Sequence, residues 1–275
     1  MRYLSDLDKT LLKSDLSIGR LSAKVWNEAV NSGEGLSIAT ARSYTGVKKL
    51  LDGLELREPM ILLDGVMIAS ADGEIVHLSA MGRDLASEVV SMAREKMDIH
   101  PLVVSLGDDD RESFIYPKKP NRFQKELLST FHNDRRVVEG DETVIYDRNL
   151  KLVFLDEKER CLALKDMLKE SFGEELEIKL SPDPYIDCWF MTVLHPEGDK
   201  VHAVAKLEEM GMIDRESLTF FGDSHNDLEL MRSVGRGVAV SNAIEEVKRV
   251  ADIVLDRDND QEAVAHFIAG ELAIF

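Results

Sequence analysis

The sequence predicts an α/β protein whose doubly wound parallel sheet is interrupted by an inserted α+β domain. Three observations support this fold class. Short apolar runs alternate with segments of helical apolar spacing in residues 1–80, and the same alternation returns in residues 189–275. Such alternation is typical of right-handed βαβ units and of a mostly parallel sheet. Between these segments, in residues 81–188, strands and helices follow an irregular order, so we expect a separate α+β domain there.

The N-terminal segment supplies the first three predicted strands. Residues 2–5 form a short, partly apolar run, and residues 21–30 place apolar side chains three or four positions apart before a polar Asn-Ser-Gly triplet ends the pattern. This combination predicts a strand followed by a helix. By the same criteria we expect a strand over 36–39, a helix over 47–54 and a strand over 60–63.

A hairpin signal marks the point where the alternation stops. The dipeptide Asp72-Gly73 lies between two apolar runs, residues 66–69 and 74–78. Such a dipeptide between strands favours a tight antiparallel turn. The inserted domain is expected to follow, with helices over 83–96, 120–131 and 158–172 and strands over 102–105, 113–116, 150–155 and 176–180.

The C-terminal segment completes the predicted core. We expect residues 189–194 to return to the core sheet as an apolar strand that precedes a helix over 203–210. Residues 218–221 then form an apolar strand, as expected when helices cover both faces of a parallel sheet. The remaining predictions are helices over 228–233 and 243–250, strands over 237–240 and 252–255, and a last helix from residue 261.

Composition limits the partners and the compartment that we expect. The chain has 275 residues, 44% of them hydrophobic, and a formal net charge of −18. This acidic balance disfavours nucleic acids and anionic membrane surfaces, because their phosphates would be repelled. No apolar run approaches the roughly 20 residues that span a bilayer, and because the chain begins with a predicted strand we expect no cleaved leader. The two cysteines, Cys161 and Cys188, lack metal-type spacing, which suits a reducing cytoplasm. We expect a cytoplasmic monomer or homodimer.

The first polar cluster, Asp-Leu-Asp-Lys-Thr at residues 6–10, directly follows the first predicted strand. Because residues two apart in a strand point to the same side, Asp6 and Asp8 would share one small volume. Two carboxylates this close favour either a divalent metal or a nucleophile paired with an acid. Turn chemistry and helix capping are the ordinary alternatives. A calcium EF-hand loop is excluded, because Leu11 stands where the loop needs Gly and Ser17 where it needs Glu.

Three further polar clusters follow predicted strands. They are Thr40-Ala41-Arg42, the turn that contains Lys200, and Gly-Asp-Ser-His-Asn-Asp at residues 222–227. In a doubly wound sheet the chemistry lies outside the carboxyl ends of the strands, so all four clusters are expected at one edge. A helix cap or a surface lysine would explain any one of them. Their occurrence together, in this order, favours a common site.

The four clusters resemble the motifs of the haloacid dehalogenase superfamily, and the resemblance covers nearly the whole chain. Residues 81–188 resemble the type IIB cap of its Cof-type, sugar-phosphatase-like branch. The resemblance therefore implies a Rossmann-like catalytic core with an inserted α+β cap. Five positions depart from the usual pattern. Lys9, Ala41 and Val201 stand where Gly is common, Asp64 stands where Asn is common, and Thr192 stands where Glu is common. The roles of Lys9 and Asp64 stay open.

The resemblance implies a magnesium-dependent phosphatase of small phosphorylated metabolites, with sugar phosphates as the first candidates, acting through an aspartyl-phosphate. Asp6 would be the nucleophile, and Asp8 would be the general acid and base. Thr40 and Lys200 would complete the catalytic set by binding the phosphoryl group. The implied phosphate contacts are Thr10, Ala41, Arg42 and Asn226, with a surface ion pair as the alternative for Arg42. The implied magnesium ligands are Asp6, Asp8 through its backbone carbonyl, Asp223 and Asp227. The last would hold a metal-bound water or orient Lys200.

Two alternatives to a phosphatase remain. A phosphomutase or phosphotransferase of the same superfamily would pass the phosphoryl group to a hydroxyl instead of water. A catalytically silent ligand-binding protein would keep the fold without the turnover. Substrate choice would lie in the cap, where the possible contacts, each also explicable by ordinary packing, are Tyr116, Lys118, Lys119, Tyr185 and Trp189.

Overall fold

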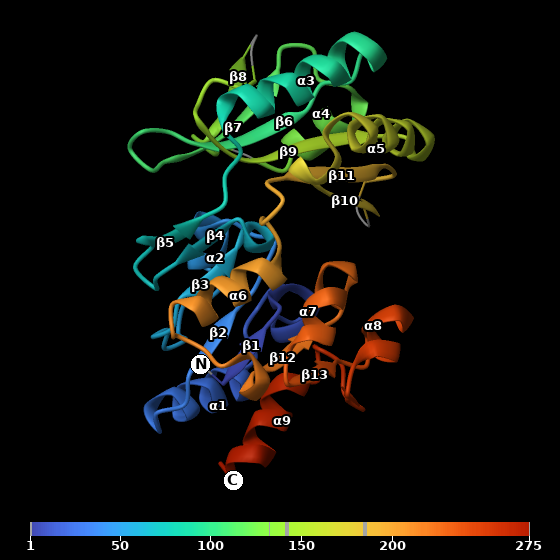
Figure 1. Ribbon diagram of the computed structural model, residues 1–275. Helices are drawn as coiled ribbons and strands as arrows, with labels where there is room; N and C mark the ends of the chain where they lie inside the picture. The colour runs from blue at the N-terminus through green and yellow to red at the C-terminus, as the bar shows by residue number, and fades with distance from the viewer. Residues whose placement is uncertain (1, 132, 141–142, 184–185, 275) are drawn as a thin grey trace. The chain divides into compact units, whose positions relative to one another are not determined.

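Figure 1 shows the computed structural model, which describes residues 2–131, 133–140, 143–183 and 186–274. The chain divides into two compact units. The first unit contains Met1–Leu78 and Asp199–Phe275, and the second contains Ser79–Gly198. The first unit therefore joins the two ends of the chain, whereas the second is a continuous insertion.

The main sheet of the first unit is parallel throughout. Its strands lie in the order β14-β13-β12-β1-β2, and every neighbouring pair is parallel. All residues of β1, β2 and β12 are buried, as expected for strands covered on both faces. The predicted parallel core is confirmed by β1 (Tyr3–Ser5), β2 (Leu36–Ile38), β12 (Thr219–Gly222), β13 (Arg236–Ala239) and β14 (Ile253–Val254).

Each helix of the first unit buries at least one apolar side chain. In α1, Val25, Trp26, Ala29 and Val30 are buried, because side chains three or four residues apart share one helix face. Complete burial of a large apolar side chain contributes about 1.5–3 kcal/mol. No helix of the described chain is both long and apolar enough to cross a membrane. The helices are α1 (Arg20–Asn31), α2 (Tyr44–Lys48), α6 (Lys200–Glu209), α7 (Leu228–Ser233), α8 (Glu245–Val250) and α9 (Ala263–Leu272).

The third strand, which the prediction places in the parallel arrangement over residues 60–63, also begins an antiparallel sheet. β3 (Met60–Leu62) pairs antiparallel with β4 (Met67–Ala69), and β4 pairs antiparallel with β5 (Ile75–Leu78). A parallel bridge between Ala39 and Ile61 adjoins the end of β2. The chain reverses directly after β3, so its nearest partner in sequence takes up its hydrogen bonds. The hairpin predicted around Asp72-Gly73 is present as β4 and β5.

The second unit is an α+β domain, as predicted. Its sheet has the order β10-β11-β9-β6-β7-β8, in which β7 and β8 are parallel and the other pairs are antiparallel. The strands are β6 (Leu102–Leu106), β7 (Glu112–Pro117), β8 (Val137–Gly140), β9 (Arg148–Asp156), β10 (Glu177–Pro182) and β11 (Trp189–Leu194). The helices are α3 (Arg83–Met97), α4 (Arg122–Leu128) and α5 (Lys158–Phe172).

Central strand β9 contributes to apolar clusters on both faces of this sheet. Leu152 and Phe154 belong to a cluster with residues of α3 and α5, whereas Val153 and Leu155 belong to a second cluster with Phe123 of α4. Because alternate residues of a strand point to opposite faces, α3 and α5 cover one face and α4 covers part of the other.

Strand β11 lies in the second unit, although its apolar pattern predicted residues 189–194 to be a strand of the core. It is hydrogen-bonded between β10 and β9, and Met191 and Val193 pack in the cluster under α3 and α5. On the opposite face, Phe190 packs against the cluster that contains Phe123. A central strand covered on both faces has the same continuous apolar pattern as a parallel core strand, so the pattern did not distinguish the two.

Candidate active site

Loops from three adjacent strands of the parallel sheet meet at its carboxyl edge. β1 lies between β12 and β2, and each of these strands is followed by a polar cluster of the sequence. Asp6 follows β1, Thr40 lies two residues beyond β2, and Asp223 follows β12. Because the chain leaves β1 toward β2 and later returns on its other side, β1 is the switch point where ligands bind in such sheets.

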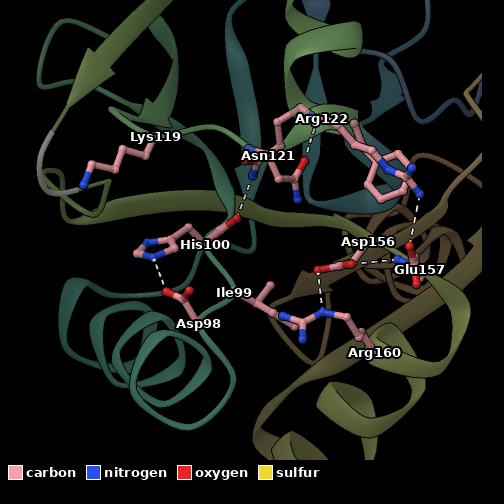
Figure 2. A pocket seen from close by; sticks show the side chains of 11 residues that line it. Asp98, Ile99, His100, Lys119, Asn121, Arg122, Asp156, Glu157 and Arg160 are labelled. Carbon is pink, nitrogen blue, oxygen red and sulfur yellow. Dashed lines mark hydrogen bonds and ion pairs between the residues drawn. The ribbon is translucent and has the colours of Figure 1, made fainter.

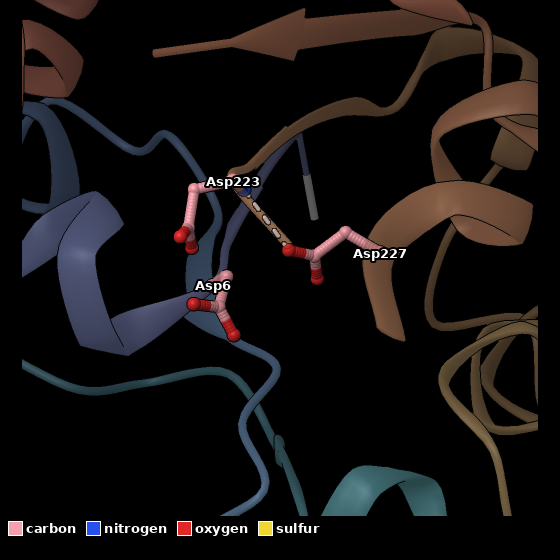
Figure 3. Close-up of side chains that lie close together, drawn as sticks. All are labelled: Asp6, Asp223 and Asp227. Atoms are coloured by element: carbon pink, nitrogen blue, oxygen red, sulfur yellow. Dashed lines mark hydrogen bonds between the residues drawn. The ribbon is translucent and has the colours of Figure 1, made fainter. Parts of the chain in front are cut away.

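Three of the predicted metal ligands come together at this edge (Figure 3). Asp6, Asp223 and Asp227 each offer a carboxylate oxygen, and these oxygens lie within 4.8 Å of one another. The three residues are only 5%, 6% and 0% exposed. Buried carboxylates this close repel each other strongly unless a cation compensates them, so the donor set fits a hard divalent ion that prefers oxygen ligands.

Lys200 supplies one compensating charge. Its Nζ donates to Asp6 Oδ1 at 2.6 Å and to Asp227 Oδ1 at 2.7 Å, and its side chain is 1% exposed. Lys200 is the first residue of α6, where the preceding Asp199 caps the helix by accepting the backbone N–H of His202. A buried ion pair of this kind is costly to break, because one partner is left charged without compensation.

The pKa values reflect the excess of negative charge. Burial disfavours the Lys200 ammonium, but the carboxylates of Asp227 and Asp6 outweigh that effect and raise the pKa of Lys200. Burial raises the pKa of Asp6 well above its usual range, and the bond to Lys200 offsets only part of that rise. Burial and the charge of Asp227 raise the pKa of Asp223 to about 6. One lysine therefore does not balance three carboxylates.

The turn after β12 is held together by Asp227. Its Oδ2 accepts the backbone N–H groups of Asp223 and Ser224, both at 3.0 Å. A Cβ atom on Gly222 would lie 2.8 Å from the Asp227 side chain, so the glycine allows the carboxylate to fold back over the turn. Asp227 thus orients this loop with one oxygen and binds Lys200 with the other.

Asp8 lies outside the acidic cluster. Arg42 holds its carboxylate in a two-pronged pair, with Nε donating to Oδ2 at 2.7 Å and Nη2 donating to Oδ1 at 2.6 Å. Strand periodicity predicts Asp8 on the same side as Asp6. The strand ends at Ser5, however, and residues 7–11 form an irregular helical turn in which Lys9 has a φ of 59°. The period of two therefore no longer applies at Asp8.

Thr10 contacts a carboxylate of the acidic cluster, and its predicted phosphate contact stays a prediction. Its hydroxyl donates to Asp223 Oδ1 at 3.0 Å, and the residue is 1% exposed. This bond lowers the pKa of Asp223, although burial and Asp227 outweigh it. Thr10 therefore orients one of the three clustered carboxylates.

Thr40 is buried beside the same edge. Its hydroxyl oxygen accepts the backbone N–H of Arg42 at 3.2 Å, and its own backbone N–H donates to Ile61. Ala41 between them is exposed. The predicted phosphate contacts Thr40, Ala41 and Arg42 therefore form one tight turn at the end of β2.

Asn226 is hydrogen-bonded to Asp64, whose role is open from the sequence. Its Nδ2 donates to Asp64 Oδ1 at 3.1 Å, and its Oδ1 accepts the hydroxyl of Ser224 at 2.6 Å. Asp64 is 7% exposed and lies two residues beyond the end of β3. The signal that could have revealed this position is its placement as an aspartate at the end of an apolar strand, like Asp6 and Asp223.

The second unit contains a cavity of about 400 Å³ (Figure 2), lined by Asp98, Ile99, His100, Lys119, Asn121, Arg122, Phe123, Gln124, Asp156, Glu157 and Arg160. Each carboxylate in it has a cationic or imidazole neighbour: Asp98 with His100 at 3.5 Å, Glu157 with Arg122 at 3.0 Å, and Asp156 with Arg160 at 3.0 Å. This cavity lacks the uncompensated charge of the Asp6 cluster.

Two of the other cap residues named from the sequence are aromatic side chains that pack against apolar clusters of the second unit. Tyr116 packs beside the apolar cluster of Phe123, and Trp189 packs on the opposite cluster with the Lys158 ammonium 4.8 Å from its ring centre. Lys118 is exposed. Tyr185 lies outside the described residues. Packing thus accounts for the two described aromatic side chains.

Known proteins match the chain over nearly its whole length. A family model described as haloacid dehalogenase-like hydrolase matches residues 3–268. An HMP-PP phosphatase of Yersinia pestis is 27% identical over 265 residues, which cover 96% of this chain and 92% of that protein. Among solved structures, TM0651 of Thermotoga maritima has a TM-score of 0.78 at 22% identity, covering 98% and 96% of the two chains. A haloacid dehalogenase-like hydrolase of Bacteroides thetaiotaomicron has a TM-score of 0.77 at 22% identity, covering 99% and 98%.

Proposed function

Because the chain belongs to the haloacid dehalogenase-like hydrolases, we propose that it is a magnesium-dependent phosphatase of small phosphate monoesters. The observation that carries this proposal is the buried cluster of Asp6, Asp223 and Asp227 with Lys200 bonded to two of them. A carboxylate nucleophile, a fixed cation and an oxygen-rich metal site are what phosphoryl transfer through a covalent intermediate requires.

Asp6 is the proposed nucleophile. Lys200 holds its Oδ1, which leaves Oδ2 to form a bond to phosphorus while the ester oxygen leaves. Burial makes the Asp6 anion reactive by removing its water shell, and Lys200 limits the repulsion between this anion and the anionic ester. A water oxygen then bonds to phosphorus, and the bond from phosphorus to Asp6 breaks, which releases inorganic phosphate.

Asp8 is the proposed proton carrier for both steps. It would donate a proton to the leaving ester oxygen and then accept one from the attacking water. Its carboxylate is half-exposed and held by Arg42, so its position is fixed while it stays accessible to solvent. Thr40, with its hydroxyl in the neighbouring turn, is the proposed donor to a phosphoryl oxygen.

Magnesium is the proposed ion for the acidic cluster. Asp6 and Asp223 are its proposed direct side-chain ligands. Asp227 is the outer partner, because its oxygens already bind Lys200 and two backbone N–H groups. When bound, the ion would neutralise charge on the transferred phosphoryl group. The raised pKa values of Asp6 and Asp223 support this assignment, since a buried cation would favour both anions.

The proposed substrate class is a phosphorylated small metabolite, with sugar phosphates and the HMP-PP of the Yersinia relatives as first candidates. The test is release of inorganic phosphate from a panel of such esters, measured with magnesium and again with EDTA. We expect turnover that requires magnesium and that Asp6→Asn abolishes. The matched control is Asp52→Asn, which changes an exposed aspartate of the same unit.

Two outcomes would overturn the proposal. Isomerised sugar phosphate without free phosphate would indicate a phosphomutase or phosphotransferase. No turnover on any ester, together with ligand binding, would indicate a silent binding protein. Turnover that persists in EDTA would contradict the magnesium assignment alone.

A further inference from the structure

The turn Leu63–Gly65 adopts a left-handed backbone conformation that residues with a side chain rarely adopt. Three consecutive residues have positive φ: Leu63 at 53°, Asp64 at 66° and Gly65 at 123°. A left-handed conformation costs an ordinary residue about 1–2 kcal/mol. Such strain persists only where surrounding contacts impose it, and it is often found at functional sites.

This turn contacts two segments of the proposed active site through its backbone. Leu63 N–H donates to the carbonyl of Arg42 at 3.0 Å, and Asp64 N–H donates to the carbonyl of Thr40 at 2.9 Å. A Cβ atom on Gly65 would lie 2.0 Å from the carbonyl oxygen of Asp199, the residue before Lys200. The turn is therefore fitted between the Thr40 loop and the start of α6.

The carboxylate of Asp64 reaches a third segment. It accepts from Asn226 Nδ2 at 3.1 Å, while Asn226 Oδ1 accepts from Ser224 at 2.6 Å. An ionised carboxylate can only accept hydrogen bonds, so Asp64 determines which end of the Asn226 amide faces it. Asn226 belongs to the turn that carries Asp223 and Asp227.

We infer that Asp64 is a positioning residue of the active site: its carboxylate orients Asn226 and thereby fixes the 222–227 turn. Neither the strand pattern nor the four sequence clusters assigns it this role. The inference rests on the proposed function, because the turn matters for catalysis only if Asp223 and Asp227 do. Substitution of a residue that contributes only to folding would change stability, but its effect on kcat would not depend on whether Asn226 is present.

The first experiment compares two variants of Asp64 in the full-length protein with magnesium. Asp64→Gly removes the carboxylate and tolerates the positive φ, whereas Asp64→Asn keeps an acceptor oxygen and also tolerates it. We expect Asp64→Gly to lower kcat about 10- to 100-fold, as for loss of a supporting partner, with KM changed much less. Asp64→Asn should recover most of the loss.

A matched control is Asp98→Gly, which removes another aspartate of positive φ, 53°, that caps α3 in the second unit. It should leave kcat unchanged. If Asp98→Gly lowers kcat as much as Asp64→Gly does, or if Asp64→Gly leaves kcat unchanged, the inference is wrong.

A double-mutant cycle tests the route through Asn226. If Asp64 acts by orienting that amide, Asp64→Gly should cost less than about twofold in kcat when Asn226→Ala is already present. An equal loss in both backgrounds would show that Asp64 acts independently of Asn226, which overturns the inference.

Hydrogen exchange separates this inference from the proposed function. Faster exchange of the backbone amides in 222–227 is expected for Asp64→Gly, with protection restored in Asp64→Asn. This measurement needs no turnover. If the wild-type protein releases no phosphate, the proposed function fails, and the exchange result alone decides whether Asp64 fixes the turn: unchanged exchange in Asp64→Gly overturns it.

Discussion

Removing one charge from the acidic cluster should stabilise the metal-free protein and abolish its stabilisation by magnesium. The substitution is Asp223→Asn, which keeps an oxygen that can accept the hydroxyl of Thr10. In the folded protein the pKa of Asp223 is raised from 3.8 to about 6. The folded state therefore holds this proton to a higher pH than the unfolded state does. Its stability falls as pH rises from about 4 through 6 and stays low above that range.

The size of the effect follows from that rise in pKa. A change from 3.8 to about 6 corresponds to about 3 kcal/mol, which is an upper limit for the penalty of ionised Asp223 at pH 7.5. In EDTA at this pH, Asp223→Asn should relieve part of that penalty and raise Tm by about 2–4 °C for each kcal/mol. At pH 4, where Asp223 is protonated in the folded wild type, the gain should disappear.

Magnesium should reverse the order of stability. Adding the ion at pH 7.5 stabilises the wild type in proportion to the logarithm of its concentration over Kd, and Asp223→Asn should lose most of this gain. The assay is thermal unfolding across a magnesium titration, with Asp52→Asn as a control for removal of a surface charge. A variant that is less stable than wild type in EDTA, or that gains as much from magnesium, would refute the reasoning.

Three further outcomes are expected. Lys200→Ala should cost about 2–4 kcal/mol of transition-state stabilisation, by analogy with losing one preorganised donor, while magnesium half-saturation changes little; a steep rise in that concentration would contradict the assignment of Lys200 to the phosphoryl group. Asp6→Asn should trap no phosphoenzyme, whereas Asp8→Asn should be slow with alkyl phosphates and less impaired with an acyl phosphate, and equal loss on both substrates would count against the acid role. Gly65→Ala should lower Tm, because the new Cβ would lie 2.0 Å from the carbonyl of Asp199 at a φ of 123°; an unchanged Tm would contradict this packing.

Sequence patterns predicted the features that depend on local spacing: the order of strands and helices, and the placement of polar residues after strands. The order of strands and helices predicted the parallel sheet, because βαβ units have a fixed handedness. The meeting of Asp6 with Asp223 followed from the rule that carboxyl ends share one edge, and the structure indeed brings their carboxylates together. Asp227 joins the same cluster because it lies four residues after Asp223 in the short turn that follows β12.

Local spacing did not determine the direction of side chains whose partners are distant in the sequence. Asp8 turns to Arg42 because the strand ends before it, and Thr10 points to Asp223, which is 213 positions away. The sequence of β11 resembles that of a core strand, because a strand buried on both faces is continuously apolar whether it lies in the parallel sheet of the first unit or in the sheet of the second unit. Asp64 stayed unassigned because its partner Asn226 lies 162 positions away.

The insertion joins the first unit next to the proposed catalytic lysine. The second unit ends at Gly198, Asp199 caps α6, and Lys200 is the first residue of that helix. The backbone carbonyl of Asp199 also lies so close to Gly65, the residue after Asp64, that a Cβ atom on Gly65 would be 2.0 Å from its oxygen. The position of Lys200 therefore depends on a helix start that is fixed on one side by the Leu63–Gly65 turn and is linked on the other to the inserted unit. For this reason the turn needs a residue without a Cβ atom at Gly65: a shift of Asp199 would move the ammonium that Asp6 and Asp227 share.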